Sequence, residues 1–125
     1  MAAGSCTRGG LPRISVIIAV RNCESYLRGC IASLGRQYCT SFETIIVDDG
    51  STDRTPEVIA ELINSNPSLS IISNRNVEAL GIATSRNRAL SLAASEYVAV
   101  LDGDDRCRAD RLNQQTCFLD ANPRV

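Results

Sequence analysis

The sequence of 125 residues contains no lysine, no histidine and no tryptophan, so all 13 of its basic residues are arginine. The absence of lysine excludes a Schiff-base mechanism, and the absence of histidine excludes an imidazole base or metal ligand. Any chemistry must therefore depend on carboxylates, guanidinium groups, hydroxyls, thiols or the backbone. The net charge of -1 argues against a protein that binds nucleic acid by neutralising phosphates.

The chain also lacks a long apolar run. The longest, residues 16–20, is far too short to span a bilayer, and residues 1–12 contain no apolar core of signal-peptide length. The six cysteines show no C-x-x-C spacing, which argues against a zinc site. Scattered thiols without a secretory signal are typical of free cysteines in a reducing compartment. We therefore expect a cytoplasmic protein with a disordered segment over residues 1–12 and one domain over residues 13–125.

Short β-branched runs alternate with longer stretches of helical periodicity. Four strands are predicted, over residues 14–20, 42–47, 69–73 and 97–101. A helix is predicted after each strand: the first begins after residue 22, the second ends before Asn66-Pro67, the third covers about residues 80–94 and the fourth about residues 110–120. Repeated strand–helix alternation predicts an α/β fold, a three-layer structure whose mostly parallel sheet has right-handed crossovers.

Local signals refine these helices. Asn22 can cap the first helix, and Thr52 or Asp53 can cap the second, which has Pro56 near its start. The first helix has its apolar positions on one face, at Leu27, Cys30, Ile31 and Leu34. In the third helix we expect the inward positions to be Ile82, Ala89, Leu90 and Ala93.

Acidic residues follow the last predicted strand. Asp102, Asp104 and Asp105 place three carboxylates within four residues, and Gly103 allows a tight turn between them. Crowded carboxylates repel one another unless a cation or protonation relieves the repulsion. A hard divalent cation takes oxygen ligands and can share its shell with phosphates. An isolated acidic turn would simply be solvated, but in parallel sheets ligands bind beyond the carboxyl ends of the strands.

Two further residues are candidates for ligand binding. Asp49 follows the second predicted strand, and its carboxylate can accept hydrogen bonds from a base or ribose. Alternatively, residues 49–53 form only a turn and a helix cap. Arg86 lies in the first turns of the third helix. Its guanidinium can pair with a diphosphate, or it can form a surface salt bridge. For Arg88 we expect a surface salt bridge.

Read together, these motifs resemble family 2 glycosyltransferases with the GT-A fold. The resemblance runs from about residue 13 to residue 119 and is carried by residues 14–22, 33–37, 42–53, 76, 81, 85–87 and 93–105. Among them are Asp48-Asp49-Gly50-Ser51 and Asp102-Gly103-Asp104-Asp105. Each motif alone is weak, but their order and spacing are specific. Together with the alternation, the resemblance implies the strand order 3-2-1-4, counted along the chain.

The resemblance implies transfer of a sugar from a nucleotide-diphosphate donor, with inversion and with Mn²⁺ or Mg²⁺. Ala19 and Arg21 would line the base pocket, with Val20 between them as a further substrate-binding residue, and Asp49 would hydrogen-bond the base. Asp104 and Asp105 would serve ribose and metal, with Asp102 as the other strand-end acid. The metal would stabilise charge on the departing nucleotide diphosphate.

Three departures from the family pattern limit what the resemblance implies. Ala19 stands where the family usually has proline, and Arg21 where an aromatic commonly stacks on the base, so UDP, GDP and dTDP donors all stay open. The family's acceptor-binding half, with its general base, lies beyond Val125. Because a missing general base typically lowers the rate about 10²–10⁴-fold, we expect a donor-binding fragment with little activity alone.

Other functions fit parts of the pattern. A non-catalytic nucleotide-binding or regulatory α/β module is the main alternative. A phospho-acceptor receiver domain normally has a lysine at its last strand, and this chain contains none. A nucleotidyltransferase normally has a glycine-rich, basic phosphate loop after the first strand, where this chain has Asn22-Cys23-Glu24. Both functions are therefore disfavoured. The acceptor, whether glycan, lipid or protein, is open, as is peripheral membrane association through segments outside this chain.

Overall fold

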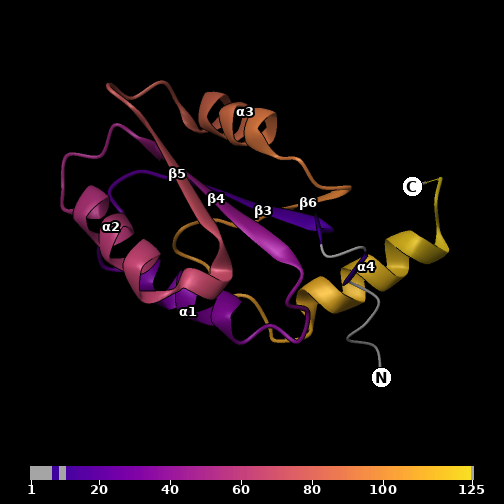
Figure 1. Cartoon of the computed structure of the whole chain (residues 1–125). Helices are drawn as coiled ribbons and strands as arrows, with labels where there is room; N and C mark the ends of the chain where they lie inside the picture. The colour runs from indigo at the N-terminus through magenta and orange to yellow at the C-terminus, as the bar shows by residue number, and fades with distance from the viewer. Residues whose placement is uncertain (1–6, 9–10, 125) are drawn as a thin grey trace.

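The computed structural model describes residues 7–8 and 11–124 (Figure 1). A parallel sheet forms the middle layer, with α3 above it and α1 and α2 below it in the view of Figure 1. The strands are β1 (Thr7–Arg8), β2 (Leu11–Pro12), β3 (Ile14–Val20), β4 (Phe42–Asp49), β5 (Ile71–Asn76) and β6 (Tyr97–Val100). The helices are α1 (Leu27–Gly35), α2 (Thr55–Ser65), a 3₁₀ turn (Pro67–Leu69), α3 (Ile82–Leu92) and α4 (Arg111–Ala121).

The main sheet has four parallel strands in the order β5-β4-β3-β6. Counted as the four predicted strands, this is the order 3-2-1-4, so the predicted topology is confirmed. The order reverses between β3 and β6, because the chain leaves β3 toward β4 and returns to the other side of β3 with β6. In open parallel sheets such a reversal opens a crevice at the carboxyl ends of the strands.

Alternating side chains of the central strands supply two cores. On one face Val16, Ile18 and Ile46 pack with the buried residues of α1 and α2. On the other face Ile17, Ile45 and Val47 pack against Ala89 of α3. The apolar runs at β3 and β4 are nearly continuous because both faces are covered, as parallel strands require. The buried face of α1 consists of the predicted residues, Leu27, Cys30, Ile31 and Leu34, together with Ser33.

Several local predictions were wrong. Leu69 belongs to the 3₁₀ turn and not to a strand, and β5 begins at Ile71. Helix α3 buries Ser85 and Ala89, whereas Ile82 and Leu90 are 41% and 50% exposed. The inward face of α3 follows the i, i+4 pair Ser85 and Ala89, and the prediction holds for Ala89 and for Ala93, which is partly buried against the same core.

Asn22 does not cap α1, which begins five residues later at Leu27. Its backbone has φ 52°, in the left-handed region, which asparagine tolerates better than most residues. Neither Thr52 nor Asp53 is the cap residue of α2, which is Arg54 and makes no side-chain cap bond, but Asp53 still contacts the start of this helix. Its Oδ1 accepts a hydrogen bond from the N–H of Thr55, the first residue of α2, at 2.9 Å, and Pro56 follows.

The expectation of free thiols holds for four of the described cysteines. Cys23, Cys30, Cys107 and Cys117 are not disulfide-bonded, whereas Cys39 is. Among the described residues, no helix has the length and apolarity needed to cross a membrane. The cytoplasmic location stays a prediction.

The start of the chain was expected to be disordered up to residue 12. Within this segment, β1 and β2 pair antiparallel. Residues 1–6 and 9–10 lie outside the described residues. Both the disorder and the domain boundary at Arg13 therefore stay predictions.

Candidate functional site

A cavity of about 620 Å³ lies at the carboxyl ends of β3, β4 and β6, where the strand order reverses. Its walls come from the loops that follow these strands, from the loop after β5 and from the start of α3. The lining residues are Ala19, Arg21, Asn22, Cys23, Asp49, Ala79, Gly81, Ile82, Arg86, Asp102, Gly103 and Asp104. Six of the predicted site residues are among them.

The loop after β6 forms an acidic end of this cavity. Asp102, Asp104 and Asp105 are exposed, and each offers a carboxylate oxygen such that the three atoms lie within 4.8 Å of one another. The loop turns through a hydrogen bond from the N–H of Asp105 to the carbonyl of Asp102, at 3.0 Å. This set consists only of carboxylate oxygens, which are hard ligands, and its spacing fits a single Mg²⁺ or Mn²⁺ ion.

Close packing holds this acidic loop. A Cβ added at Gly103 would lie 2.5 Å from Cγ1 of Val20, so a larger residue would displace the loop. Cys30 in α1 donates its thiol to the carbonyl of Asp102, at 3.6 Å. Burial raises the pKa of Cys30 to about 12, so this thiol stays protonated and can keep donating. Val20 therefore supports the site from the core side and does not line the cavity, contrary to its prediction as a substrate-binding residue.

Arg86 faces the acidic loop from the second turn of α3. Its Nη2 donates to Oδ1 of Asp102 at 2.7 Å, with side chains 42% and 53% exposed. The guanidinium thus lies in the cavity between the acidic end and the remaining walls. It can present the donors that a diphosphate needs, but its partner in the described structure is a carboxylate.

Asp49, the last residue of β4, is a buried carboxylate at the other end of the cavity. Its Oδ1 accepts hydrogen bonds from the N–H of Leu80 at 2.7 Å and from Nδ2 of Asn76 at 2.9 Å. Its Oδ2 accepts one from the N–H of Gly81 at 3.0 Å. The backbone donor of Leu80 is the largest cause of a lowered pKa, helped by Asn76 and Gly81 and opposed by burial. Asp49 is therefore ionised at neutral pH.

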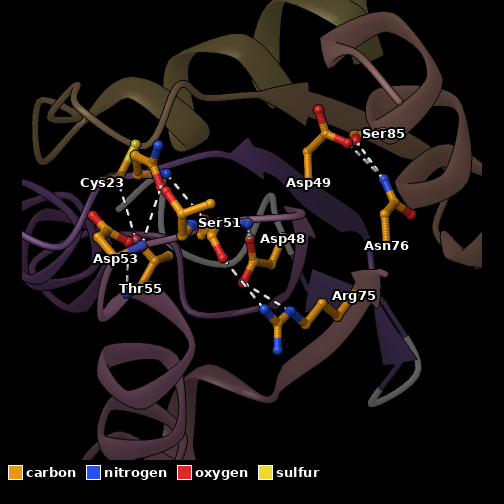
Figure 2. Close-up of polar contacts among 11 residues, drawn as sticks. Cys23, Asp48, Asp49, Ser51, Asp53, Thr55, Arg75, Asn76 and Ser85 are labelled. Atoms are coloured by element: carbon orange, nitrogen blue, oxygen red, sulfur yellow. Dashed lines mark hydrogen bonds and ion pairs between the residues drawn. The ribbon is translucent and has the colours of Figure 1, made fainter. Parts of the chain in front are cut away.

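A polar network behind Asp49 fixes its orientation (Figure 2). Nδ2 of Asn76 is shared between Asp49 and the hydroxyl of Ser85, at 2.9 and 3.0 Å. Arg88 donates to Oδ1 of Asn76, where a surface salt bridge had been predicted for it. A side-chain hydrogen bond from Ser85 also lowers the pKa of Asp49, so four donors surround this carboxylate, and a donor of a ligand would have to share one of its oxygens or replace Ser85.

The loops after β3 and β4 are joined by side-chain hydrogen bonds, part of which Figure 2 shows. Oδ1 of Asn22 accepts from the N–H of Thr52 at 2.8 Å, and the N–H of Asn22 donates to Ser51 Oγ at 2.9 Å. The N–H of Cys23 donates to Thr55 Oγ1 at 2.9 Å. Because these bonds tie backbone to side chain across the two loops, they hold Arg21 and Asp49 on one wall.

Asp48 precedes Asp49 but has a structural place. It is 2% exposed, accepts a hydrogen bond from the N–H of Ser51 at 3.0 Å and lies 3.8 Å from Nε of Arg75 (Figure 2). Asp48 is absent from the cavity lining. Adjacent residues of a strand point to opposite faces, and so only one acid of this pair reaches the cavity.

Comparison with known proteins identifies the family. The sequence profile of "Glycosyl transferase family 2" matches residues 15–125, nearly the whole chain. The chain belongs to glycosyltransferase family 2. The family resemblance read from the strand-end motifs is therefore confirmed.

Family 2 relatives with assigned names include polysaccharide synthases. The chain is 39% identical over 100 residues to the chondroitin synthase and to the hyaluronan synthase of Pasteurella multocida. The match covers 80% of this chain but only 10% of each synthase. A putative glycosyltransferase of Bacillus subtilis, EpsH, is 34% identical over 82% of this chain and 29% of its own length. The chain thus spans less than a third of these relatives.

Solved structures of transferases share the fold. Residues 1–349 of TarS from S. aureus, in complex with UDP, superpose with a TM-score of 0.81 and 31% identity, over 89% of this chain and 33% of that one. A mannosyltransferase from Pyrobaculum calidifontis, in complex with GDP-Man and Mn²⁺, superposes with a TM-score of 0.85 and 29% identity. That match covers 92% of this chain and 34% of the other. The predicted GT-A type is confirmed.

Sequence reasoning missed some of the cavity walls. Cys23, Ala79 and Ile82 line the cavity beside the predicted residues. Cys23 had been considered only as a free thiol, although its position directly after the loop residues Arg21 and Asn22 was a usable signal. Ile82 had been assigned to the core from helical periodicity, which cannot distinguish a core from a cavity. Asp105 is in the acidic group but not in the lining.

Proposed function

We propose that this chain is the donor-binding part of a metal-dependent, inverting glycosyltransferase and binds a nucleotide-diphosphate sugar with Mn²⁺ or Mg²⁺. The observation that carries the proposal is one cavity with two different acidic ends. At one end lies a buried, ionised Asp49, and at the other lie three exposed carboxylates. A nucleotide diphosphate has N–H donors at its base and metal-binding oxygens at its diphosphate.

With the base at the Asp49 end of the cavity and the diphosphate at the end with three exposed carboxylates, several lining residues have proposed roles. Ala19 and Arg21 lie against the base, over which the planar Arg21 guanidinium can stack. Asp49 accepts a hydrogen bond from the base, and Arg86 reaches the diphosphate. Asp104 and Asp105 hold the metal and contact the ribose side, with Asp102 beside them. When bound, the cation would stabilise negative charge on the departing nucleotide diphosphate.

Transfer itself needs groups that we do not assign in this chain. No residue of the described cavity is placed as the general base that deprotonates an acceptor hydroxyl. We therefore propose that the chain binds donor but transfers sugar slowly or not at all, since a missing base typically costs about 10²–10⁴ in rate. Relatives named as chondroitin and hyaluronan synthases support a polysaccharide acceptor.

A calorimetric titration tests the proposal. UDP, GDP and dTDP are titrated into the wild-type chain and into Asp104→Asn, each with and without Mn²⁺. We expect at least one nucleotide to bind, more tightly with Mn²⁺ than without it, and the metal-dependent gain to be lost in Asp104→Asn. Metal-independent binding, or a variant equal to wild type, would count against the metal–diphosphate role. If the chain alone transferred sugar from a nucleotide sugar at an appreciable rate, the proposal that it binds donor without efficient transfer would be wrong.

A further inference from the structure

The ion pair between Arg86 and Asp102 joins two residues that line the cavity. Arg86 lines the cavity and is the side chain that we propose for the diphosphate, and Asp102 belongs to the carboxylate group that can hold a cation. At 2.7 Å, Nη2 of Arg86 and Oδ1 of Asp102 are in direct contact. Each of these groups is therefore engaged by the other, and neither is fully available to the ligand that it is placed to bind.

Arg86 and a bound cation would compete for the carboxylate oxygens of Asp102. Asp102 lies with Asp104 and Asp105 inside 4.8 Å, where three like charges repel and a nearby cation stabilises them. Arg86 supplies one positive charge to this group through Asp102. A divalent cation supplies two, and it would also displace the guanidinium from the oxygen it needs. Both side chains are about half exposed, so the pair is weak enough to open.

We propose that Arg86 neutralises Asp102 before ligands bind, and that binding of the metal–nucleotide exchanges these partners. Asp102 then turns to the cation, and the released guanidinium of Arg86 turns to the diphosphate. This inference rests on the proposed function and adds a coupling to it. Each ligand frees the group that the other ligand needs, so binding of metal and of nucleotide diphosphate is mutually reinforcing through one ion pair.

The exchange predicts effects of opposite sign from a single substitution. In Arg86→Gln the acidic group loses its competing cation, and we expect Mn²⁺ alone to bind about two- to five-fold more tightly, the range of an exposed ion pair. The same variant loses a charge-assisted hydrogen bond to phosphate, and we expect UDP without metal to bind about ten-fold more weakly. A merely structural Arg86 would weaken both.

The reciprocal substitution extends the test. In Asp102→Asn we expect Mn²⁺ to bind more weakly, because one carboxylate is lost, and UDP without metal to bind more tightly, because Arg86 is released. The matched control is Arg28→Gln, which breaks an exposed pair with Glu61, also at 2.7 Å, on α1 and α2 outside the cavity lining. This control should leave both affinities at the wild-type level.

Mn²⁺ binding is measured by the electron paramagnetic resonance of the free ion, and UDP binding by calorimetry, with circular dichroism to verify folding of each variant. Unchanged or weaker Mn²⁺ binding in Arg86→Gln, with wild type binding both ligands, overturns the exchange and leaves the proposed function standing. Failure of wild type to bind Mn²⁺ in the presence of any nucleotide overturns both. If Arg86→Gln does not fold, unchanged metal-free UDP binding by Asp102→Asn overturns the exchange.

Discussion

At the scale of single residues, Asp49 is a buried carboxylate that the structure already uses and that we also propose as a ligand contact. It accepts two backbone N–H groups at the start of α3 and one amide N–H from Asn76. These bonds keep it ionised and fix its direction, and so the same carboxylate can face a ligand with little freedom to move. A binding residue held in this way loses little conformational entropy when the ligand arrives.

Asp49→Asn should destabilise the chain by about 1–3 kcal/mol at pH 7, because an amide offers one acceptor oxygen to three buried donors. Since folding lowers the pKa of Asp49, its contribution is complete above the unfolded value of about 3.9 and is lost as pH falls through the lower folded value. The difference in the free energy of unfolding between wild type and Asp49→Asn should therefore shrink below about pH 4. Urea unfolding across pH checks this, with exposed Asp105→Asn as the control; a pH-independent gap would contradict it.

Gly50 is the second residue on which the cavity wall depends. It has φ 67°, and a Cβ there would lie 2.7 Å from the backbone nitrogen of Ala79 and 2.8 Å from the carbonyl carbon of Glu78. Strain and collision act together, so Gly50→Ala should cost about 1–3 kcal/mol and weaken nucleotide binding. Gly35→Ala, at the end of α1 with no atom within 4 Å, should be neutral or slightly stabilising. Thermal unfolding compares the two, and equal effects would refute the collision argument.

At the scale of elements, the start of β3 is tied to β6 and α4 by Arg13. This side chain is 5% exposed, donates to both carboxylate oxygens of Asp120 at 3.0 and 2.7 Å and to Glu96 at 2.6 Å, and lies over the ring of Tyr97. One arginine thus fixes the beginning of two neighbouring strands and the last helix. These strands carry the loops of the cavity at their other ends.

Arg13→Ala should destabilise the chain by about 1–3 kcal/mol, less than for a fully buried pair because Asp120 and Glu96 are 33% and 45% exposed. Loss of Arg13 also leaves two carboxylates close together. Chemical denaturation measures the change. The control Arg28→Ala, in an exposed pair with Glu61, should change the free energy of unfolding by no more than about 0.5 kcal/mol. Similar losses in both variants would refute a special role for Arg13.

Element boundaries were predictable where hydrophobic periodicity was strong. The continuous apolar runs of β3 and β4 and the one-sided pattern of α1 were all identified from the residues. Helix α3 was placed correctly in sequence, but its inward face was not, because Ile82 and Leu90 are apolar and yet exposed. Periodicity records where apolar residues recur, and it cannot tell which of them another element covers.

At the scale of the whole molecule, the alkylation rate of Cys23 should report whether a ligand occupies the cavity. Cys23 lines the cavity, and partial burial is the largest cause that raises its pKa, followed in the same direction by nearby aspartates. We expect slow alkylation that accelerates toward alkaline pH and is suppressed by UDP with Mn²⁺. Mass spectrometry of the labelled peptides measures this, with exposed Cys117 as the unprotected reference and buried Cys30 as the unreactive one. Labelling of Cys23 that is indifferent to ligand would contradict our placement of the nucleotide.

The sheet leaves apolar side chains exposed near β6. Val98, Val100 and Phe118 are 39%, 45% and 56% exposed, and the first two lie on the edge strand. Exposed apolar groups beside an edge strand favour association. We expect the chain to self-associate with rising concentration and Phe118→Ser to reduce this, as measured by light scattering. A monodisperse wild-type monomer at high concentration would refute the expectation.

Alone, the sequence determined the fold class, the order of the elements and the end of the sheet at which polar residues collect, because these depend on local patterns and on the geometry common to parallel sheets. Only the tertiary structure decided which atoms meet. Three examples are the pairing of Arg86 with Asp102, the use of Asn22 to join two loops, and the hydrogen bonds that Asp49 accepts from Asn76, Leu80 and Gly81. All of them connect residues at least 16 positions apart in the chain. Such contacts depend on strand register and loop path, which no local pattern of residues encodes.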